Sequence, residues 1–226
     1  MNLYTIGYLL LFGAFALGLY AQTSTARTYG KYFQVNNERG LSGYEVARAM
    51  LDRHGLQDVE IREIQGTLTD HYDPTKRVMC LSTGVYRGKT ISSMGVAAHE
   101  TGHAIQHAEQ FGLMRLRTAI APLAIISSKI MLFVLIGGFV LQMTRLIRLS
   151  VILLFVLFLF QLVTLPVEFD ASRRAMNELE SGGMVSPAEL SSIQEVLHAA
   201  WLTYVAATLG SLAQVIRFMG MSRDSR

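Results

Sequence analysis

The stretch LSVILLFVLFLFQLVTLPVE, from Leu149 to Glu168, contains no charged side chain before its last residue. A helix needs about 20 mostly apolar residues to cross the hydrocarbon core of a bilayer, so residues 149–167 are predicted to span a membrane. The whole chain has a matching composition, because 51% of its 226 residues are hydrophobic and only 16% are charged. Soluble domains have about 25% charged residues, so the sequence indicates a mainly α-helical integral membrane protein.

A second apolar run precedes this stretch and is predicted to form a transmembrane hairpin with it. Residues 119–144 are apolar except for Lys129, and a lysine at mid-bilayer is costly. We therefore place Lys129 at the interface, where its stem can snorkel, with a span at residues 130–144. Residues 119–128, which include Pro122, then form an approach segment on the membrane surface.

Two more apolar runs bring the expected number of transmembrane helices to about four. Residues 3–22 precede the first charged side chain, Arg27. They are interpreted as an uncleaved anchor, because the opening MNLY lacks the positive region of a signal peptide. Residues 199–216 carry several polar side chains that could face other helices. This run is interpreted as a fourth span, and the alternative is a buried helix of a soluble domain.

The region between the first two spans is predicted to fold as a small α+β unit. Ser42 has Glu45 three residues later, which is the spacing of a capping box, and the helix that follows should end near His54. Near-alternation of apolar and charged residues predicts a strand at 59–64, and residues 70–74 are rich in turn formers. A second strand is predicted at 77–82. An edge strand at this place could pair with an extended substrate. The next helix is predicted to open at Ser92 or Ser93.

The expected organisation therefore has five segments. They are an N-terminal transmembrane anchor at 1–26, an α+β catalytic unit at 27–118, an approach segment and transmembrane hairpin at 119–167, a helix and loop at 168–196, and a C-terminal helix, expected to be transmembrane, at 197–226.

Charge and cysteine content exclude some classes of function. The formal net charge is +3 and the pI is about 9.1, but the basic residues are scattered beside the apolar runs. They are interpreted as membrane-flanking charges, so no nucleic-acid partner is expected. Cys80 is the single cysteine, so no intrachain disulfide can form.

The positive-inside rule slightly favours a multi-pass protein of the cell membrane whose catalytic unit is cytoplasmic. Basic residues on the catalytic side are Arg27, Lys31, Arg115, Arg117, Arg173 and Arg174, and those on the other side are Arg145, Arg148, Arg217, Arg223 and Arg226.

Near its end the α+β unit contains the sequence AAHETGHAIQHAEQ (97–110), which has a His-Glu-x-x-His pattern at His99, Glu100 and His103. Residues four apart lie on one face of a helix, so the two imidazoles can bind one zinc ion. Glu100 lies next to the first ligand and can act on a water molecule without binding the metal. The alternative is a helix that matches a short pattern by chance. The apolar residues around the pattern argue against this alternative, because they predict a buried helix in which unpaired polar groups are costly.

A third ligand is needed, since catalytic zinc sites use three protein ligands and a water. His107 lies on the same helix, and three ligands on one straight helix cannot surround an ion tetrahedrally, so His107 is interpreted as a surface or supporting residue. Glu168, the first charge after the uncharged span, is the preferred candidate. Asp170, Glu178 and Glu180 are rival ligands.

Five segments resemble the YugP-like neutral zinc metallopeptidases of bacterial membranes. They are TDHYDP (69–74), LSTGVY (81–86), VAAHETGHAIQ (96–106), LPVEFDASRRA (165–175) and LTYVAA (202–207). The resemblance covers nearly the whole chain. It implies a zincin-type domain with a gluzincin site, in which His99, His103 and Glu168 bind Zn²⁺ and Glu100 is the catalytic base.

The chain is similar more distantly to membrane gluzincins of the HtpX and CAAX-protease group. Those proteins carry an aspartate four residues after the third ligand, and it orients a histidine. Here that position is Ser172, so the sequence does not identify the residue that orients the histidine.

The expected function is an integral-membrane zinc endopeptidase that hydrolyses peptide bonds in membrane-proximal protein segments, with the lipid bilayer as its surroundings. Three residues are candidates for the group that donates a hydrogen bond to the oxyanion, namely His71, His198 and Tyr204, and the sequence does not choose among them. An inactive zinc-binding membrane scaffold is the alternative, although such a scaffold has no use for Glu100 as a base. An intramembrane protease of the site-2 type is disfavoured, because charged residues at 109, 115 and 117 follow the motif closely.

Overall fold

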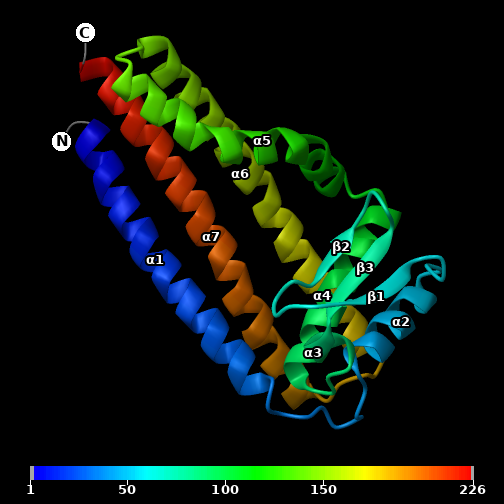
Figure 1. Ribbon diagram of the computed structural model, residues 1–226. Coiled ribbons are helices and arrows are strands. Elements are labelled where there is room, and N and C mark those ends of the chain that lie inside the picture. Colours follow the sequence, from blue (N-terminus) through cyan, green and yellow to red (C-terminus); the bar gives the residue numbers. More distant parts are fainter. Residues whose placement is uncertain (1–2, 225–226) are drawn as a thin grey trace. The chain divides into compact units, whose positions relative to one another are not determined.

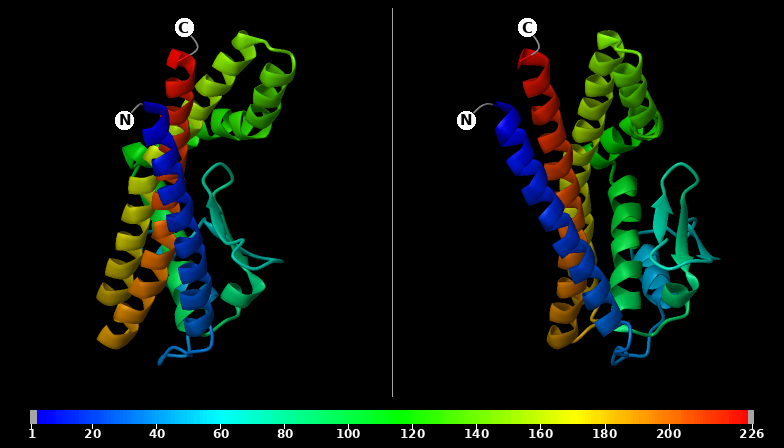
Figure 2. Two further views of the ribbon diagram at one scale, coloured as in Figure 1. Left: turned by 90° about the vertical axis from the view of Figure 1, so that its left-hand side faces the viewer. Right: turned by 60° about the vertical axis from the view of Figure 1, so that its left-hand side comes forward.

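The computed structural model describes the backbone of residues 3–224 and the side chains of residues 5–219. The ends of the first and last predicted segments, and the side chains of Arg223 and Arg226, lie outside these ranges. Figure 1 shows the elements in chain order, and Figure 2 shows them from two other directions. They are α1 (Leu3–Tyr32), α2 (Gly43–Arg53), β1 (Glu60–Ile64), β2 (His71–Asp73), β3 (Val78–Ser82), α3 (Thr83–Tyr86), α4 (Ile91–Ala108), α5 (Gly112–Val140), α6 (Thr144–Ser181) and α7 (Pro187–Asp224).

The chain divides into two compact units. A helical unit contains residues 1–21, 115–166 and 202–226, and a mixed unit contains residues 22–114 and 167–201. The helices α1, α5, α6 and α7 each contribute residues to both units.

Four of the described helices are long and apolar enough to cross a membrane, in agreement with the expected number. These stretches are Thr5–Tyr32, Gly112–Val140, Thr144–Ser181 and Pro187–Met219. Within the helical unit, many large apolar side chains are exposed, for example Phe12 at 76% and Phe133 at 75%. Exposed apolar surface of this extent is what a lipid-facing helix needs.

The helices of the helical unit pack through close backbone approaches at glycine. A Cβ on Gly7 of α1 would lie 2.7 Å from the Cα of Arg217 in α7, and a Cβ on Gly138 of α5 would lie 3.0 Å from the backbone nitrogen of Ile147 in α6. Small residues allow this approach between membrane helices. A small core around Leu154 and Val215 joins α6 to α7.

The apolar helices are longer and less interrupted than the sequence predicts. A break is found before α5, where Gln110 has a φ of 55° and the helix begins at Gly112. The helix α5 continues through Pro122, which the sequence analysis placed in a separate approach segment, and α6 continues through Pro166. A proline removes one amide donor from a helix, and apolar membrane helices tolerate this loss.

The mixed unit contains one sheet of three strands in the order β1-β3-β2. β1 runs parallel to β3, with Glu60 opposite Val78, and β2 runs antiparallel to β3, with Tyr72 opposite Met79. Two expectations were wrong. Residues 71–73 form a strand and not a turn, and the strand predicted at 77–82 is the central strand and not an edge.

The helix α2 is built as the sequence predicts. Ser42 is its N-cap, and the Ser42 side chain and the Glu45 side chain form both hydrogen bonds of a capping box. The helix ends at Arg53, and Gly55 follows with a φ of 70°, a left-handed conformation that glycine adopts without strain. Buried residues of α2, among them Met50 and Leu51, then pack in the cores of the mixed unit.

The helix α4 is the central element of the mixed unit. Its Ala97, Ala104 and Ile105 belong to one core together with residues of α2 and the sheet. Its Met94 and Ala98 belong to a second core with residues of α6 and α7. Figures 1 and 2 show α4 beside the sheet. Because α4 is covered on both sides, its polar side chains are held in a mostly buried environment.

Candidate metal centre

The helix α4 begins at Ile91, one or two residues before the predicted Ser92 or Ser93. Thr90 is the N-cap, and its side chain accepts a hydrogen bond from the backbone nitrogen of Ser93. The helix then carries His99, Glu100 and His103, whose spacing places both histidines on the face that meets α6.

The structure brings His99 and His103 together with Glu168 of α6. The Oε2 atom of Glu168 lies 3.2 Å from Nε2 of His99 and 3.4 Å from Nε2 of His103. One ligand atom from each residue lies within 4.8 Å of the other two. The Glu168 side chain is only 2% exposed. This is the one group of three potential metal-ligating side chains found among the described residues.

These distances fit a zinc ion. Zinc binds imidazole nitrogen at about 2.0–2.1 Å and carboxylate oxygen at about 2.0–2.2 Å. Two ligand atoms at tetrahedral positions around such an ion are therefore about 3.3–3.4 Å apart. Both distances from Glu168 to the histidines are close to this value. Two neutral imidazoles and one carboxylate are also a ligand set that catalytic zinc sites use.

Small residues let α4 and α6 approach closely enough for this contact. A Cβ on Gly102 would lie 2.5 Å from the carbonyl oxygen of Ala171. Ala171 itself is fully buried. Gly102 lies on α4 between the two histidines and Ala171 lies three residues after Glu168, so the closest approach of the helices coincides with the three candidate ligands.

The other nitrogen of each histidine also has a partner. Nδ1 of His99 lies 3.1 Å from Oγ of Ser172, and Nδ1 of His103 lies 3.0 Å from Oε1 of Gln106. Ser172 occupies the position of the aspartate in the more distant gluzincins, and it contacts a histidine here. Gln106 received no role in the sequence analysis. A polar residue on a buried helix, one turn after a candidate ligand, is the signal that could have indicated it.

The rival ligands form other contacts. Asp170 accepts hydrogen bonds from Gln106, Arg173 and Arg174. Glu178 forms an ion pair with Arg53, and its Oε1 lies 3.0 Å from Nε2 of His54. Glu180 lies on the exposed surface of α6. The structure thus places Glu168 beside both histidines and directs Asp170 and Glu178 to other partners.

The carboxylate of Glu100 is held by the sheet. Its Oε2 accepts a hydrogen bond from the backbone nitrogen of Tyr72, at 3.0 Å, and the residue is 8% exposed. The Tyr72 hydroxyl lies 2.9 Å from Nδ1 of His107. Burial raises the pKa of the Tyr72 phenol, so the phenol is neutral and can donate to His107. His107 therefore supports β2 and is absent from the ligand group.

The three oxyanion candidates have separate locations. His71 is exposed in β2, and its Nδ1 lies 2.8 Å from the carbonyl oxygen of Thr69. His198 lines a cavity of about 390 Å³ between α6 and α7, and Ser172 is another of its lining residues. Tyr204 belongs to the helical unit.

Residues 7–223 match the model of a family described as "Putative neutral zinc metallopeptidase". The chain belongs to this family. It is also 44% identical over 217 residues to "Putative membrane protease YugP" of Bacillus subtilis (strain 168), a match that covers 96% of each chain. No solved structure matches the chain. Membership in the neutral zinc metallopeptidase family agrees with the resemblance stated above, and it identifies zinc as the metal to consider at His99, His103 and Glu168.

Proposed function

We propose that this protein is an integral-membrane zinc endopeptidase of the gluzincin type, with the mixed unit as a zincin-type catalytic domain. His99, His103 and Glu168 would hold the ion. The observation that carries the proposal is the convergence of three ligand atoms from α4 and α6 within 4.8 Å, in a neutral zinc metallopeptidase family member. When bound there, zinc would polarise the scissile carbonyl and make a water molecule acidic enough to react near neutral pH.

Glu100 is the proposed general base. Its Oε2 is held by the backbone nitrogen of Tyr72, which leaves Oε1 to accept the proton of the attacking water. The water oxygen bonds to the scissile carbonyl carbon as Glu100 takes this proton. Glu100 then donates the proton to the amine that leaves when the carbon–nitrogen bond breaks.

An extended substrate segment is proposed to bind beside β2. β2 is an edge strand of the sheet, whereas β3 is central, so the role that the sequence suggested for β3 moves to β2. Tyr72 in β2 contacts Glu100 through its backbone, which places this edge next to the proposed base. Main-chain pairing at a sheet edge binds peptides with little dependence on their sequence.

Membrane-proximal segments are the proposed substrates. Glu168 lies on the same continuous helix as the uncharged run 149–167. With a rise of 1.5 Å per residue and a short side chain, the ion would lie within about 10 Å of the membrane surface. A spin label on the exposed side chain of Phe169 would measure this depth. A label more than about 20 Å outside the headgroups would contradict both the location and the membrane-proximal substrate.

Metal analysis and peptide cleavage by the purified full-length protein in detergent test the proposal. Wild type should hold about one zinc per chain, and Glu168→Ala should lose it. Glu180→Ala is the matched control, because Glu180 is an exposed glutamate on the same helix, and it should keep zinc. Full zinc occupancy in Glu168→Ala would show that the ligand assignment is wrong.

The role of the base requires a second variant. Glu100→Gln should retain zinc and lose about 10²–10⁴-fold in cleavage of a mixed-sequence fluorogenic peptide library, because an amide cannot accept the proton. Glu109→Gln, an exposed change on the residue that caps α4, should cleave normally. If Glu100→Gln cleaved like wild type, Glu100 would not be the base. Zinc binding by wild type without any cleavage would favour the inactive scaffold instead.

A further inference from the structure

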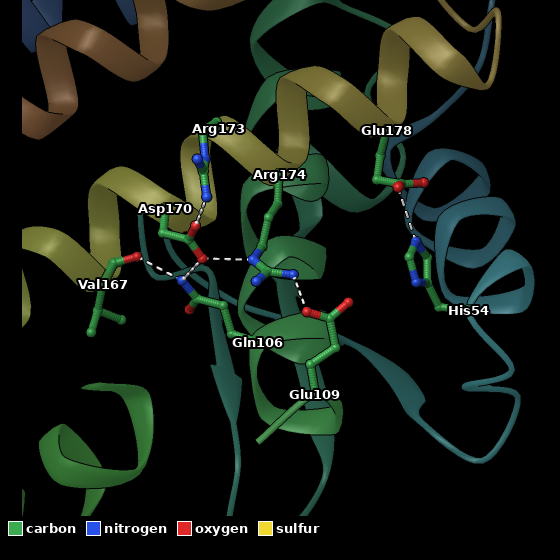
Figure 3. Close-up of polar contacts among 8 residues, drawn as sticks. All are labelled: His54, Gln106, Glu109, Val167, Asp170, Arg173, Arg174 and Glu178. Atoms are coloured by element: carbon green, nitrogen blue, oxygen red, sulfur yellow. Dashed lines mark hydrogen bonds and ion pairs between the residues drawn. The ribbon is translucent and has the colours of Figure 1, made fainter. Parts of the chain in front are cut away.

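Gln106 is a fully buried amide that lies between α4 and α6. Its Nε2 donates to the carbonyl oxygen of Val167 at 2.8 Å and to Oδ2 of Asp170 at 2.9 Å. Its Oε1 lies 3.0 Å from Nδ1 of His103. One side chain on α4 therefore contacts a candidate zinc ligand on its own helix and two neighbouring groups on α6. Figure 3 shows Gln106 between Val167 and Asp170.

The partners of Gln106 determine which end of its amide faces His103. The carbonyl of Val167 and the carboxylate of Asp170 are both acceptors, so the amide NH₂ must face them. The reversed amide would direct its oxygen at two acceptors and leave a buried polar group unsatisfied. The Asp170 carboxylate also accepts hydrogen bonds from Arg173 and Arg174, and Arg174 contacts Glu109, the C-cap residue of α4. The oxygen of Gln106 is therefore directed at His103.

This orientation determines the tautomer of His103. An amide oxygen can only accept a hydrogen bond, so Nδ1 of His103 must carry the proton. In the neutral imidazole that binds a metal, the lone pair is then on Nε2, and this is the atom that lies 3.4 Å from Oε2 of Glu168. The ring nitrogen that faces the candidate metal position is thus the one that can bind a metal when the ring is neutral. His99 differs, because its Nδ1 partner is the hydroxyl of Ser172, which can either donate or accept.

The same amide also restrains the third candidate ligand. Val167 immediately precedes Glu168 in α6, and Pro166 precedes Val167. The hydrogen bond from Gln106 to the Val167 carbonyl fixes the backbone next to Glu168 relative to α4. A single buried side chain therefore sets the ring nitrogen of His103 and the backbone position of Glu168 together.

We propose that Gln106 is the positioning residue of this metal centre, oriented by the Val167 carbonyl and the Asp170 carboxylate. This inference rests on the proposed function for the identity of the ligands. Partners that orient a metal-binding histidine typically contribute 10–100-fold to metal affinity. The alternative is that Gln106 only joins α4 to α6, in which case any loss of a polar tie between these helices would have the same effect.

Zinc affinity, measured by competition with a chromophoric chelator at one fixed pH, separates these alternatives. Gln106→Met has similar length but no hydrogen-bonding groups, and it should weaken zinc binding about 10–100-fold. Glu109→Gln removes the outer ion pair between α4 and α6 and leaves the His103 contact intact. It should bind zinc within about twofold of wild type. Equal losses in the two variants, or no loss in Gln106→Met, would overturn the proposal.

A pair of charge-changing variants keeps the test informative if Gln106→Met does not fold. Gln106→Glu places a carboxylate against Asp170 and should bind zinc poorly. Adding Asp170→Asn supplies a side-chain NH₂ that can donate to Glu at position 106, whose other oxygen can still accept from His103. The double variant should bind zinc at least about tenfold more tightly than Gln106→Glu. No improvement in the double variant would contradict the proposed orientation.

The tautomer can be measured without metal. Ring nitrogen-15 shifts of histidine in the metal-free wild-type protein should show the proton of His103 on Nδ1. An Nδ1 without a proton would overturn the inference even if zinc binds normally. In contrast, a wild-type protein with the expected tautomer and no affinity for zinc would overturn the proposed function alone.

Discussion

Gly102→Ala is a single-methyl change that should disrupt the metal centre by separating its two helices. The new Cβ would lie 2.5 Å from the Ala171 carbonyl oxygen, 3.1 Å from its carbon and 3.2 Å from its Cα. All three are backbone atoms of α6, so no side-chain rotation can relieve the contact. Ordinary carbon–oxygen contacts are about 3.3 Å or longer, so the helices must separate by about 0.8 Å.

The required separation exceeds what the site can accept. Functional sites tolerate errors of about 0.5 Å. The distances from Glu168 to His99 and His103 are 3.2 and 3.4 Å, and moving α6 away by about 0.8 Å would lengthen both to about 4 Å. That value exceeds the tetrahedral spacing of zinc ligands. Overpacking should also lower the free energy of unfolding by about 1–3 kcal/mol. The higher helix propensity of alanine offsets about 1 kcal/mol of this loss.

The assay is chelator competition for zinc together with thermal unfolding of the metal-free protein. Gly102→Ala should bind zinc at least about tenfold more weakly than wild type. Gly95→Ala is the matched control on the same helix, because its nearest neighbour is the Cγ2 methyl of the Ile193 side chain at 3.1 Å, a side-chain atom that need move by only a few tenths of an ångström. Gly112→Ala, with nothing within 4 Å, is the open-space control. Wild-type zinc affinity in Gly102→Ala would refute the argument that this close approach sets the site.

Three further predictions address zinc binding, folding and topology. Removing zinc with a chelator should lower the unfolding temperature of wild type, because a ligand that binds only the folded state stabilises it. The unfolding temperature of Glu168→Ala should not change. Equal shifts in both proteins would contradict the assignment of Glu168 to the zinc site. Ser42→Ala should destabilise the protein by about 1 kcal/mol through loss of the α2 cap, with unchanged zinc affinity. Topology can be tested with single cysteines introduced into a Cys80→Ser background. Thr67→Cys in the β1–β2 loop should react with a membrane-impermeant maleimide only after cells are opened, whereas Met143→Cys, at an exposed position, should react in intact cells. The reverse pattern would place the mixed unit outside the cell.

Local sequence signals predicted the elements that depend on near neighbours. The capping box at Ser42 and Glu45 depends on residues three apart, and it forms as expected. The four apolar helices follow from run length and hydropathy, which are also local properties. The strand predicted at 59–64 agrees closely with β1, because alternation of apolar and polar residues is visible within the strand itself.

Features that depend on distant residues were predicted less well. Residues 71–73 contain turn formers, yet they form β2 because β3 offers an antiparallel partner and Glu100 accepts the Tyr72 amide. The central position of β3 depends on pairing with two strands at once. Neither partner could be recognised from the strand's own sequence. Pro122 is likewise a local signal for a helix break, and the helix α5 continues through it.

The candidate site combines both kinds of information. The two histidines and Glu100 follow from spacing on one helix, whereas Glu168 was chosen because it is the first charge after an apolar span. The structure explains why that choice and not Asp170 meets the histidines. Asp170 lies two residues later, so it points about 200° around the helix from Glu168, where it meets Gln106, Arg173 and Arg174. Glu168 faces the histidines and Asp170 orients the amide that supports one of them, so two neighbouring carboxylates on α6 are directed to different tasks by helix geometry alone.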